Sequence, residues 1–100
     1  MSHYLLSTGA ADDLSAVWEF IAADSIDAAD RWIDKLYETF ELLALHPAMG
    51  HTRKDLTAHP VLFWPVESYL IIYRCQGGFI EIVAVTQGAR DIPAFLQQRR

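Results

Sequence analysis

The side chains best suited to metal binding or proton transfer in this chain are its four histidines, and their spacing supports neither role. A proline and a glycine lie between His46 and His51, while His3 and His59 stand far from both. Zinc sites usually take their ligands in closely spaced pairs, and no such pair is present here. The sequence therefore predicts no metal and no other cofactor.

Nucleophilic catalysis has equally little support. Ser68 lies in a predicted tight turn, but it lacks the flanking glycines of a nucleophile elbow. Gly77-Gly78 joins two predicted strands, whereas a phosphate-binding loop joins a strand to a helix. Cys75 is the only cysteine and lies in an apolar run, so we expect a buried, unreactive thiol and no intrachain disulfide. We predict no catalytic residue.

The arginines are better candidates, because they concentrate in one half of a polarised chain. Residues 1–46 have a net charge of −7 and residues 47–100 a net charge of +2, which together give the total of −5. The basic half is also the half that we predict to form a sheet, so its arginines could meet an anionic partner or a target surface. The predicted target-binding residues are Arg53, Arg74, Arg90, Arg99 and Arg100.

Each of these arginines could instead have a structural role. Carboxylates that could pair with them are Asp55, Glu67, Glu81 and Asp91. Exposed ion pairs of this kind contribute little to stability, and the stem of an arginine can also pack on a sheet. Both interpretations stay open for each arginine at this stage.

The acidic half begins with a strand and a helix. A short β-competent run over residues 3–7 leads into a helix that Ser7 or Thr8 can cap. We expect Asp12 and Asp13 in the first turn of this helix, where carboxylates favour the positive end of the dipole. Its apolar stripe has the spacing of an amphipathic helix and consists of Leu14, Val17, Trp18 and Ile21.

A second helix follows a break at residues 23–25, runs over about residues 27–46, and ends at Pro47. Its apolar stripe consists of Ala29, Ile33, Leu36, Phe40 and Leu43. Its other face carries carboxylates with few compensating cations, and such a face would repel a nucleic acid. We therefore expect no direct nucleic-acid partner, although the sheet alone could still bind one.

Three strands are predicted in the basic half, over residues 62–66, 69–75 and 79–86. Pro65 favours an edge position for the first of them, and Gly77-Gly78 predicts a hairpin between the other two. Both faces of these strands are apolar, and one helical hairpin can cover only one face of a sheet. The second face is left to a partner or to the C-terminal segment, where Asp91-Ile92-Pro93 opens a short helix.

These elements predict a single α+β domain over residues 1–100. It has an N-terminal strand, a helical hairpin, a three-stranded antiparallel meander and a short C-terminal helix. One hundred residues is an ordinary size for one domain. Because the chain shows neither a signal-peptide pattern nor a long apolar span, we expect a cytoplasmic protein without a membrane partner.

Taken together, these segments resemble the ParE branch of the RelE/ParE family of type II toxins, and the resemblance covers nearly the whole chain. In the helical half it rests on Tyr4-x-Leu6-Ser7, Ala11-x-Asp13-Leu14, Trp18-x-Phe20-Ile21-Ala22 and Ala28-Ala29-x-Arg31. After Leu43 it continues through His46-Pro47-x-x-Gly50-x-x-Arg53-x-Asp55-Leu56. In the sheet it rests on Val66-x-x-Tyr69-Leu70-Ile71-x-Tyr73, Ile80-x-Ile82 and Val85-x-x-Gly88-x-Arg90-Asp91. Each piece alone is weak, but their common order is a strong signal.

The resemblance implies a small toxin that a cognate, ParD-like antitoxin neutralises in a hetero-oligomer. RelE-like relatives cut ribosome-bound mRNA with basic and His or Tyr groups, whereas ParE-like relatives inhibit DNA gyrase by protein contact and lack that set. Here Gln87 stands where many relatives have histidine, and residues 97–100 contain no tyrosine. Because an amide cannot act as a general acid or base, the resemblance favours gyrase inhibition.

Two alternatives to gyrase inhibition remain. One is a ribosome-dependent mRNA endoribonuclease, because four side chains could still supply acid–base groups, namely His51, His59, Tyr69 and Tyr73. The other alternative is a family member that binds its antitoxin but has little toxicity.

The resemblance also accounts for the apolar content of 52%, which is high for a small domain. Antitoxins of this family wrap an extended and helical tail round their toxin and cover its apolar grooves. The predicted antitoxin-binding residues are Trp18, Trp32, Tyr37 and Trp64. The alternative for each of them is plain packing in the core.

Overall fold

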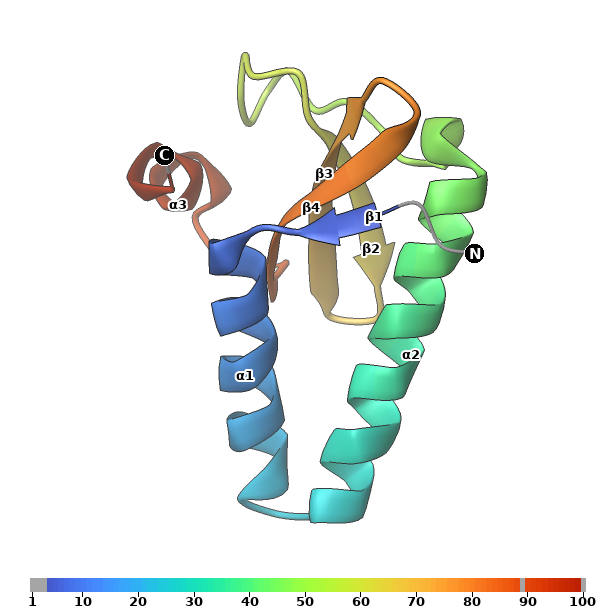
Figure 1. Ribbon diagram of the computed structural model, residues 1–100. Helices are drawn as coiled ribbons and strands as arrows, with labels where there is room; N and C mark the ends of the chain where they lie inside the picture. Colours follow the sequence, from blue (N-terminus) through green and yellow to red (C-terminus); the bar gives the residue numbers. More distant parts are fainter. Residues whose placement is uncertain (1–3, 89, 100) are drawn as a thin grey trace.

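The computed structural model describes residues 4–88 and 90–99, and its element order is the predicted one (Figure 1). The elements are β1 (Tyr4–Leu6), α1 (Thr8–Ala22), α2 (Ile26–Leu45), the 3-10 turn η1 (Pro47–Met49), β2 (Leu62–Val66), β3 (Tyr69–Gln76), β4 (Phe79–Gln87) and α3 (Ile92–Gln98). The α+β class is confirmed. His3, which the sequence placed in the first strand, lies outside the described residues.

Serine caps start both long helices. The Ser7 hydroxyl accepts a hydrogen bond from the backbone N–H of Ala10, and the Ser25 hydroxyl accepts one from Ala28. Because Ser7 is the cap, α1 begins at Thr8 and its first turn contains no acidic residue. The expectation that Asp12 and Asp13 lie in the first turn is therefore wrong.

The four strands form one sheet in the order β1-β4-β3-β2. Strand β1 runs parallel to β4, and β3 runs antiparallel to both of its neighbours. Strand β2 is an edge strand, so Pro65 lies where a missing N–H is tolerated. Gly77 and Gly78 form the predicted hairpin turn with φ angles of +36° and +94°, which glycine adopts without a Cβ clash.

A β-bulge interrupts the pairing of β3 with β4. Ile72 pairs with Ala84, but Tyr73 pairs with Ile82, so Val83 is an extra residue on β4. Polar side chains from outside the pair bond to the backbone around the bulge. The carbonyl of Val83 accepts from the hydroxyl of Ser7 at 3.0 Å, and the N–H of Val85 donates to the carboxylate of Asp13 at 2.9 Å.

Each face of the sheet has its own apolar core. The larger core lies between the sheet and the helical hairpin of α1 and α2, and includes Leu14, Leu36, Phe40, Leu43, Ile71, Tyr73, Ile80 and Ile82. The smaller core lies on the opposite face and consists of Val61, Phe63, Ile72, Ala84, Ile92 and Leu96. Since Ile92 and Leu96 belong to α3, the C-terminal segment covers the second face, as one of the two predicted alternatives required.

Tyr73 ties the end of α2 to the sheet. Its side chain is fully buried, and its hydroxyl donates to the carbonyl of Pro47 at 2.7 Å and accepts from the N–H of Gly50 at 2.8 Å. A Cβ at residue 50 would lie 2.5 Å from this hydroxyl oxygen, so the close approach requires glycine. The Pro47-x-x-Gly50 pattern therefore has a structural explanation. Burial also raises the pKa of the Tyr73 phenol.

Cys75 is exposed, which corrects the expectation of a buried thiol. It lies two residues before the Gly77-Gly78 turn, and its neighbours Arg74 and Phe79 are exposed as well. Arg74 and Cys75 near the end of β3 are exposed although Ile80, the register partner of Cys75 on β4, is buried, so the apolar pattern of β3 does not predict burial there.

Candidate functional site

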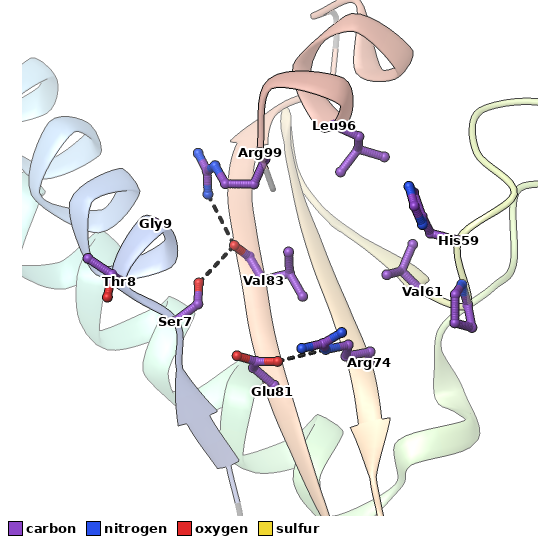
Figure 2. Close-up of a pocket in the computed structure, with 11 residues that line it drawn as sticks. Ser7, Thr8, Gly9, His59, Val61, Arg74, Glu81, Val83, Leu96 and Arg99 are labelled. Atoms are coloured by element: carbon purple, nitrogen blue, oxygen red, sulfur yellow. Dashed lines mark hydrogen bonds and ion pairs between the residues drawn. The ribbon is translucent and has the colours of Figure 1, made fainter.

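A trough of about 650 Å3 lies on the sheet face that carries α3 (Figure 2). The floor comes from β3 and β4, through Arg74, Glu81 and Val83. The start of α1, residues 7–9, lines one side, and residues 59–61 line the other. Leu96 and Arg99 of α3 close one end, as Figure 2 shows.

An ion pair across two strands lies at one end of the trough. Arg74 and Glu81 are register partners on β3 and β4, and Nε of Arg74 lies 2.7 Å from Oε1 of Glu81. The same carboxylate oxygen also accepts from the side-chain amide of Gln76 at 3.3 Å. The Arg74 side chain is 48% exposed and its terminal nitrogens have no partner among the described residues, so they can meet a ligand. A guanidinium held in this way favours a carboxylate or phosphate.

Arg99 lines the trough near α3, but its guanidinium is largely engaged in holding the fold together. Its two terminal nitrogens bind the two carboxylate oxygens of Asp13 at 2.9 and 3.1 Å, and one of them also donates to the carbonyl of Val83. The side chains are 25% and 16% exposed, respectively. Gly9 lies against this guanidinium with no room for a Cβ. Arg99 therefore joins α3, α1 and the β4 bulge, in a contact that we call the Arg99 latch.

The other predicted target-binding arginines lie outside the trough. Arg53 makes two hydrogen bonds to Asp55, at 2.8 and 3.0 Å, on an exposed segment before β2. This contact raises the pKa of Arg53 and lowers the pKa of Asp55. Arg90 is exposed and lies over the ring of Phe95, with no carboxylate partner among the described residues. Arg100 lies outside the described residues. Of the predicted set, the structure thus brings Arg74 and Arg99 to the trough, and it brings Arg90 and Arg99 to the ring of Phe95.

The four predicted antitoxin-binding aromatics divide into two pairs. Trp18 and Tyr37 lie on the helical hairpin, where Tyr37 is 38% exposed and Trp18 is half-buried with its indole N–H donating to Asp30 at 2.8 Å. Trp32 and Trp64 are half-buried against the larger core. The ring of Trp64 stacks against His51 with centroids 6.3 Å apart.

Trp32 differs from the other three aromatics in one respect. Its ring packs against Tyr69, with centroids 5.6 Å apart, and Lys35 lies over it. Its indole N–H is buried and has no hydrogen-bond partner within the described residues. An unpaired buried donor is unfavourable, so this N–H is a cost that the packing around Trp32 must offset.

The groups that could perform acid–base chemistry are dispersed. His59 lines the trough, whereas His51 stacks on Trp64 at the edge strand β2. Tyr73 is buried with its hydroxyl doubly bonded, and Tyr69 is buried beside Trp32. Among residues 4–88 and 90–99, no three His, Cys, Asp or Glu side chains are placed to hold a metal ion. No helix in the described part of the chain is long and apolar enough to span a membrane.

Three residues that the structure shows to be important at or near the surface were not identified from the sequence. Asp13 was assigned to the helix dipole, but it holds Arg99 and Val85. Phe95 was not singled out, yet Arg90 and Arg99 both lie over its ring. Phe20 is 70% exposed. The one available signal was that Phe20 is an aromatic residue off the apolar stripe of its helix.

The fold and this surface define a class of small α+β proteins in which a helical hairpin and a short C-terminal helix enclose a four-stranded sheet. The chain belongs to the ParE toxin family of type II toxin–antitoxin systems, because the model of that family matches residues 4–92. The recognition from sequence is therefore confirmed.

Solved structures support the fold. One from the chromosomal ParDE toxin–antitoxin system of P. aeruginosa has a TM-score of 0.72 to this chain at 17% sequence identity. The match covers 87% of this chain and 96% of that one. No curated protein sequence matches the chain significantly.

Proposed function

We propose that this chain inhibits DNA gyrase by protein–protein contact and that a ParD-like antitoxin neutralises it in a cytoplasmic hetero-oligomer. Membership of the ParE toxin family and the likeness to a ParDE system support the toxin role and the antitoxin partner.

The observation that supports inhibition by protein contact over RNA cleavage is that the histidine and tyrosine side chains able to transfer protons are dispersed. RNA scission requires a general base and a general acid near one phosphate. Of the four side chains that kept a ribonuclease open, only His59 lines the trough, and the hydroxyl of Tyr73 is already bound on both sides. Gln87 at the end of β4 cannot transfer a proton. This arrangement suits binding better than cleavage.

A ribonuclease is the second candidate, because the trough combines His59 with the guanidinium groups of Arg74 and Arg99. These groups could bind an RNA phosphate. The direct test induces the chain without antitoxin and measures gyrase supercoiling and cleavage of translated mRNA in parallel. Loss of supercoiling with intact mRNA supports our proposal, whereas mRNA cut within codons contradicts it. Normal growth with both activities unchanged would indicate a non-toxic family member.

The antitoxin contact has its own test. Trp18 and Tyr37 lie on the helical hairpin, Tyr37 exposed and Trp18 half-buried, and the half-buried Trp32 lies on the same helix as Tyr37. An antitoxin tail lying along the hairpin would change the surroundings of these rings. We expect a shift in tryptophan emission on adding the antitoxin, reduced by Trp18→Phe. Unchanged emission during proven complex formation would contradict this placement.

A further inference from the structure

We propose that Phe20 and Arg90 form the centre of a docking surface for a protein, which inserts one apolar side chain beside Phe20 and places a carboxylate on Arg90. The inference rests on the proposed function, because it assumes that the chain acts by contact with a protein target. It adds the surface and the chemistry of the partner.

Phe20 is the most exposed large apolar side chain in the described part of the molecule, at 70%. It lies three residues after the buried Val17 on α1, at the margin of the buried face, and its high exposure means that the core takes up little of its ring. Phenylalanine and the other aromatic residues, together with arginine, are enriched in protein interfaces relative to the rest of the surface. Phe20 therefore has the character of an interface anchor.

A hollow of about 230 Å3 lies beside Phe20, and we call it the Phe20 hollow. Helix α1 and the C-terminal end of β4 line it, together with Tyr69 of β3; its residues are Asp13, Ala16, Val17, Phe20, Tyr69, Val85, Thr86, Gln87 and Arg90. Cavities of roughly 150 Å3 hold a single ring, and sites for cofactor-sized ligands start at about 300 Å3. The Phe20 hollow therefore suits one side chain of a partner better than a small-molecule ligand.

Arg90 supplies the polar contact at this hollow. It is exposed and has no carboxylate partner among the described residues, unlike Arg53, Arg74 and Arg99. Its guanidinium carbon lies 4.9 Å from the ring centroid of Phe95, which supports it by a cation–π contact. Because Phe95 already orients this guanidinium, binding a carboxylate costs less side-chain entropy than it would for a free arginine.

The surroundings favour a protein over a nucleic acid. Helix α1 carries Asp12, Asp13 and Glu19 and has no basic residue. Asp13 lines the hollow together with Arg90, so a phosphodiester chain, which presents several negative charges in a row, would meet this acidic helix beside Arg90. A single carboxylate next to an apolar side chain meets Arg90 and the hollow without that repulsion. The partner surface therefore pairs one acidic residue with one apolar residue.

The test uses the full chain and compares Phe20→Ala and Arg90→Glu with matched controls. Leu45→Ala removes an apolar side chain of nearly equal exposure, 68%, at the far end of α2. Arg31→Glu makes the same charge change at an exposed position of α2. The readouts are affinity for purified gyrase, affinity for the antitoxin, growth arrest on induction, and a gel shift with duplex DNA.

We expect Phe20→Ala and Arg90→Glu each to weaken gyrase binding at least about tenfold and to relieve growth arrest, with both controls close to wild type. Wild-type binding by both test variants overturns the docking surface and leaves gyrase inhibition standing. If the wild type arrests growth without binding gyrase, gyrase is not the target. Relief of growth arrest by Phe20→Ala and Arg90→Glu would then still support the docking surface, and unchanged arrest would overturn it. A wild-type chain that neither arrests growth nor binds gyrase overturns both gyrase inhibition and the docking surface.

Two further outcomes would overturn the inference in specific ways. A DNA shift that disappears in Arg90→Glu would identify a nucleic acid as the occupant. Self-association that disappears in Phe20→Ala, measured by sedimentation, would identify a second copy of the chain.

Discussion

At the scale of single residues, the side chains with the most definite roles are those that bond to backbone groups. Tyr73 holds the turn after α2, Ser7 caps α1 and bonds to the bulge, and Asp13 holds the N–H of Val85. Such contacts satisfy backbone groups that the helices and the sheet leave unpaired, and an unsatisfied buried group is costly.

Removing the hydroxyl of Tyr73 is expected to destabilise the fold. Tyr73→Phe leaves the carbonyl of Pro47 and the N–H of Gly50 without their partner, so we expect a loss of about 1–2 kcal/mol in the free energy of unfolding. Urea denaturation measures it. Tyr37→Phe is the control, because the Tyr37 hydroxyl makes no hydrogen bond within the described residues. Equal stability of the two variants would show that the Tyr73 contacts contribute nothing.

Tyr73 also predicts the behaviour at alkaline pH. Burial raises its pKa, and burial together with Glu41 raises the pKa of Tyr4. The unfolded chain therefore loses phenolic protons first, near the ordinary tyrosine value of about 10. Stability is complete below that pH and falls as the pH rises through the folded-state pKa. We expect Tyr73→Phe to flatten this alkaline loss, with Tyr4 accounting for the remainder; an unchanged pH profile would contradict the assignment.

At the scale of elements, α3 stays on the sheet through a short apolar face and the Arg99 latch. Ile92 and Leu96 are the buried residues of α3, and Arg99 at its C-cap reaches Asp13 on α1 and the bulge on β4. A seven-residue helix has little stability of its own. Without the latch, we therefore expect α3 to open, and with it the end of the trough that Leu96 and Arg99 close.

The latch is expected to matter far more than the exposed ion pair of Arg53. Asp13→Ala leaves Arg99 and the N–H of Val85 unpaired in a mostly buried place, so we expect a loss of about 2 kcal/mol. Asp55→Ala removes an exposed pair, and we expect stability close to wild type. Thermal unfolding compares the two variants, and hydrogen exchange reports whether α3 opens. If Asp13→Ala and Asp55→Ala were equally stable, the Arg99 latch would not be what holds α3 on the sheet.

Gly9→Ala tests the same latch from the side of α1. Alanine in place of glycine usually stabilises a helix by up to about 1 kcal/mol. Here the new methyl group would occupy the position of the Arg99 guanidinium, so we expect destabilisation instead. In an Arg99→Ala background the conflict is absent, and the same substitution should become neutral or stabilising. A double-mutant cycle of Gly9→Ala and Arg99→Ala, measured by urea denaturation, tests this expectation. Strictly additive changes in the free energy of unfolding would contradict the contact between Gly9 and Arg99.

At the scale of the whole molecule, the charge polarity of the sequence becomes a polarity between two layers. The helical half of the chain carries nine of the thirteen acidic residues, and the face with α3 carries Arg74 and Arg99 beside the trough. Most guanidinium groups on that side pair with carboxylates, so little positive potential remains for a polyanion.

We therefore expect the free chain to leave duplex DNA unshifted at physiological salt. A net charge of −5 and an acidic helical layer oppose the counterion-driven binding on which non-specific DNA binders depend, with dissociation constants of about 10⁻⁴ to 10⁻⁶ M. A gel shift with about 10 µM protein measures it. A salt-sensitive shift at that concentration would show that the basic face acts independently of the helical layer.

The sequence by itself determined the elements, their order and the family. Apolar spacing, serine caps, Pro65 and Gly77-Gly78 are local signals, since each depends on the backbone within a few residues. The strands and helices of the structure therefore have nearly the predicted ranges, apart from the early start of α1. The same patterns indicated that the second sheet face needs a cover.

Only the tertiary structure decided the roles of individual side chains. The bulge at Val83 and the exposure of Cys75 depend on register and on where the cores end, neither of which is encoded locally. Arg99 and Asp13 meet across 86 positions of chain, and Arg90 has no carboxylate partner among the residues that the structure describes. Long-range proximity sets which charges are paired, and pairing separates a structural arginine from one that can meet a partner.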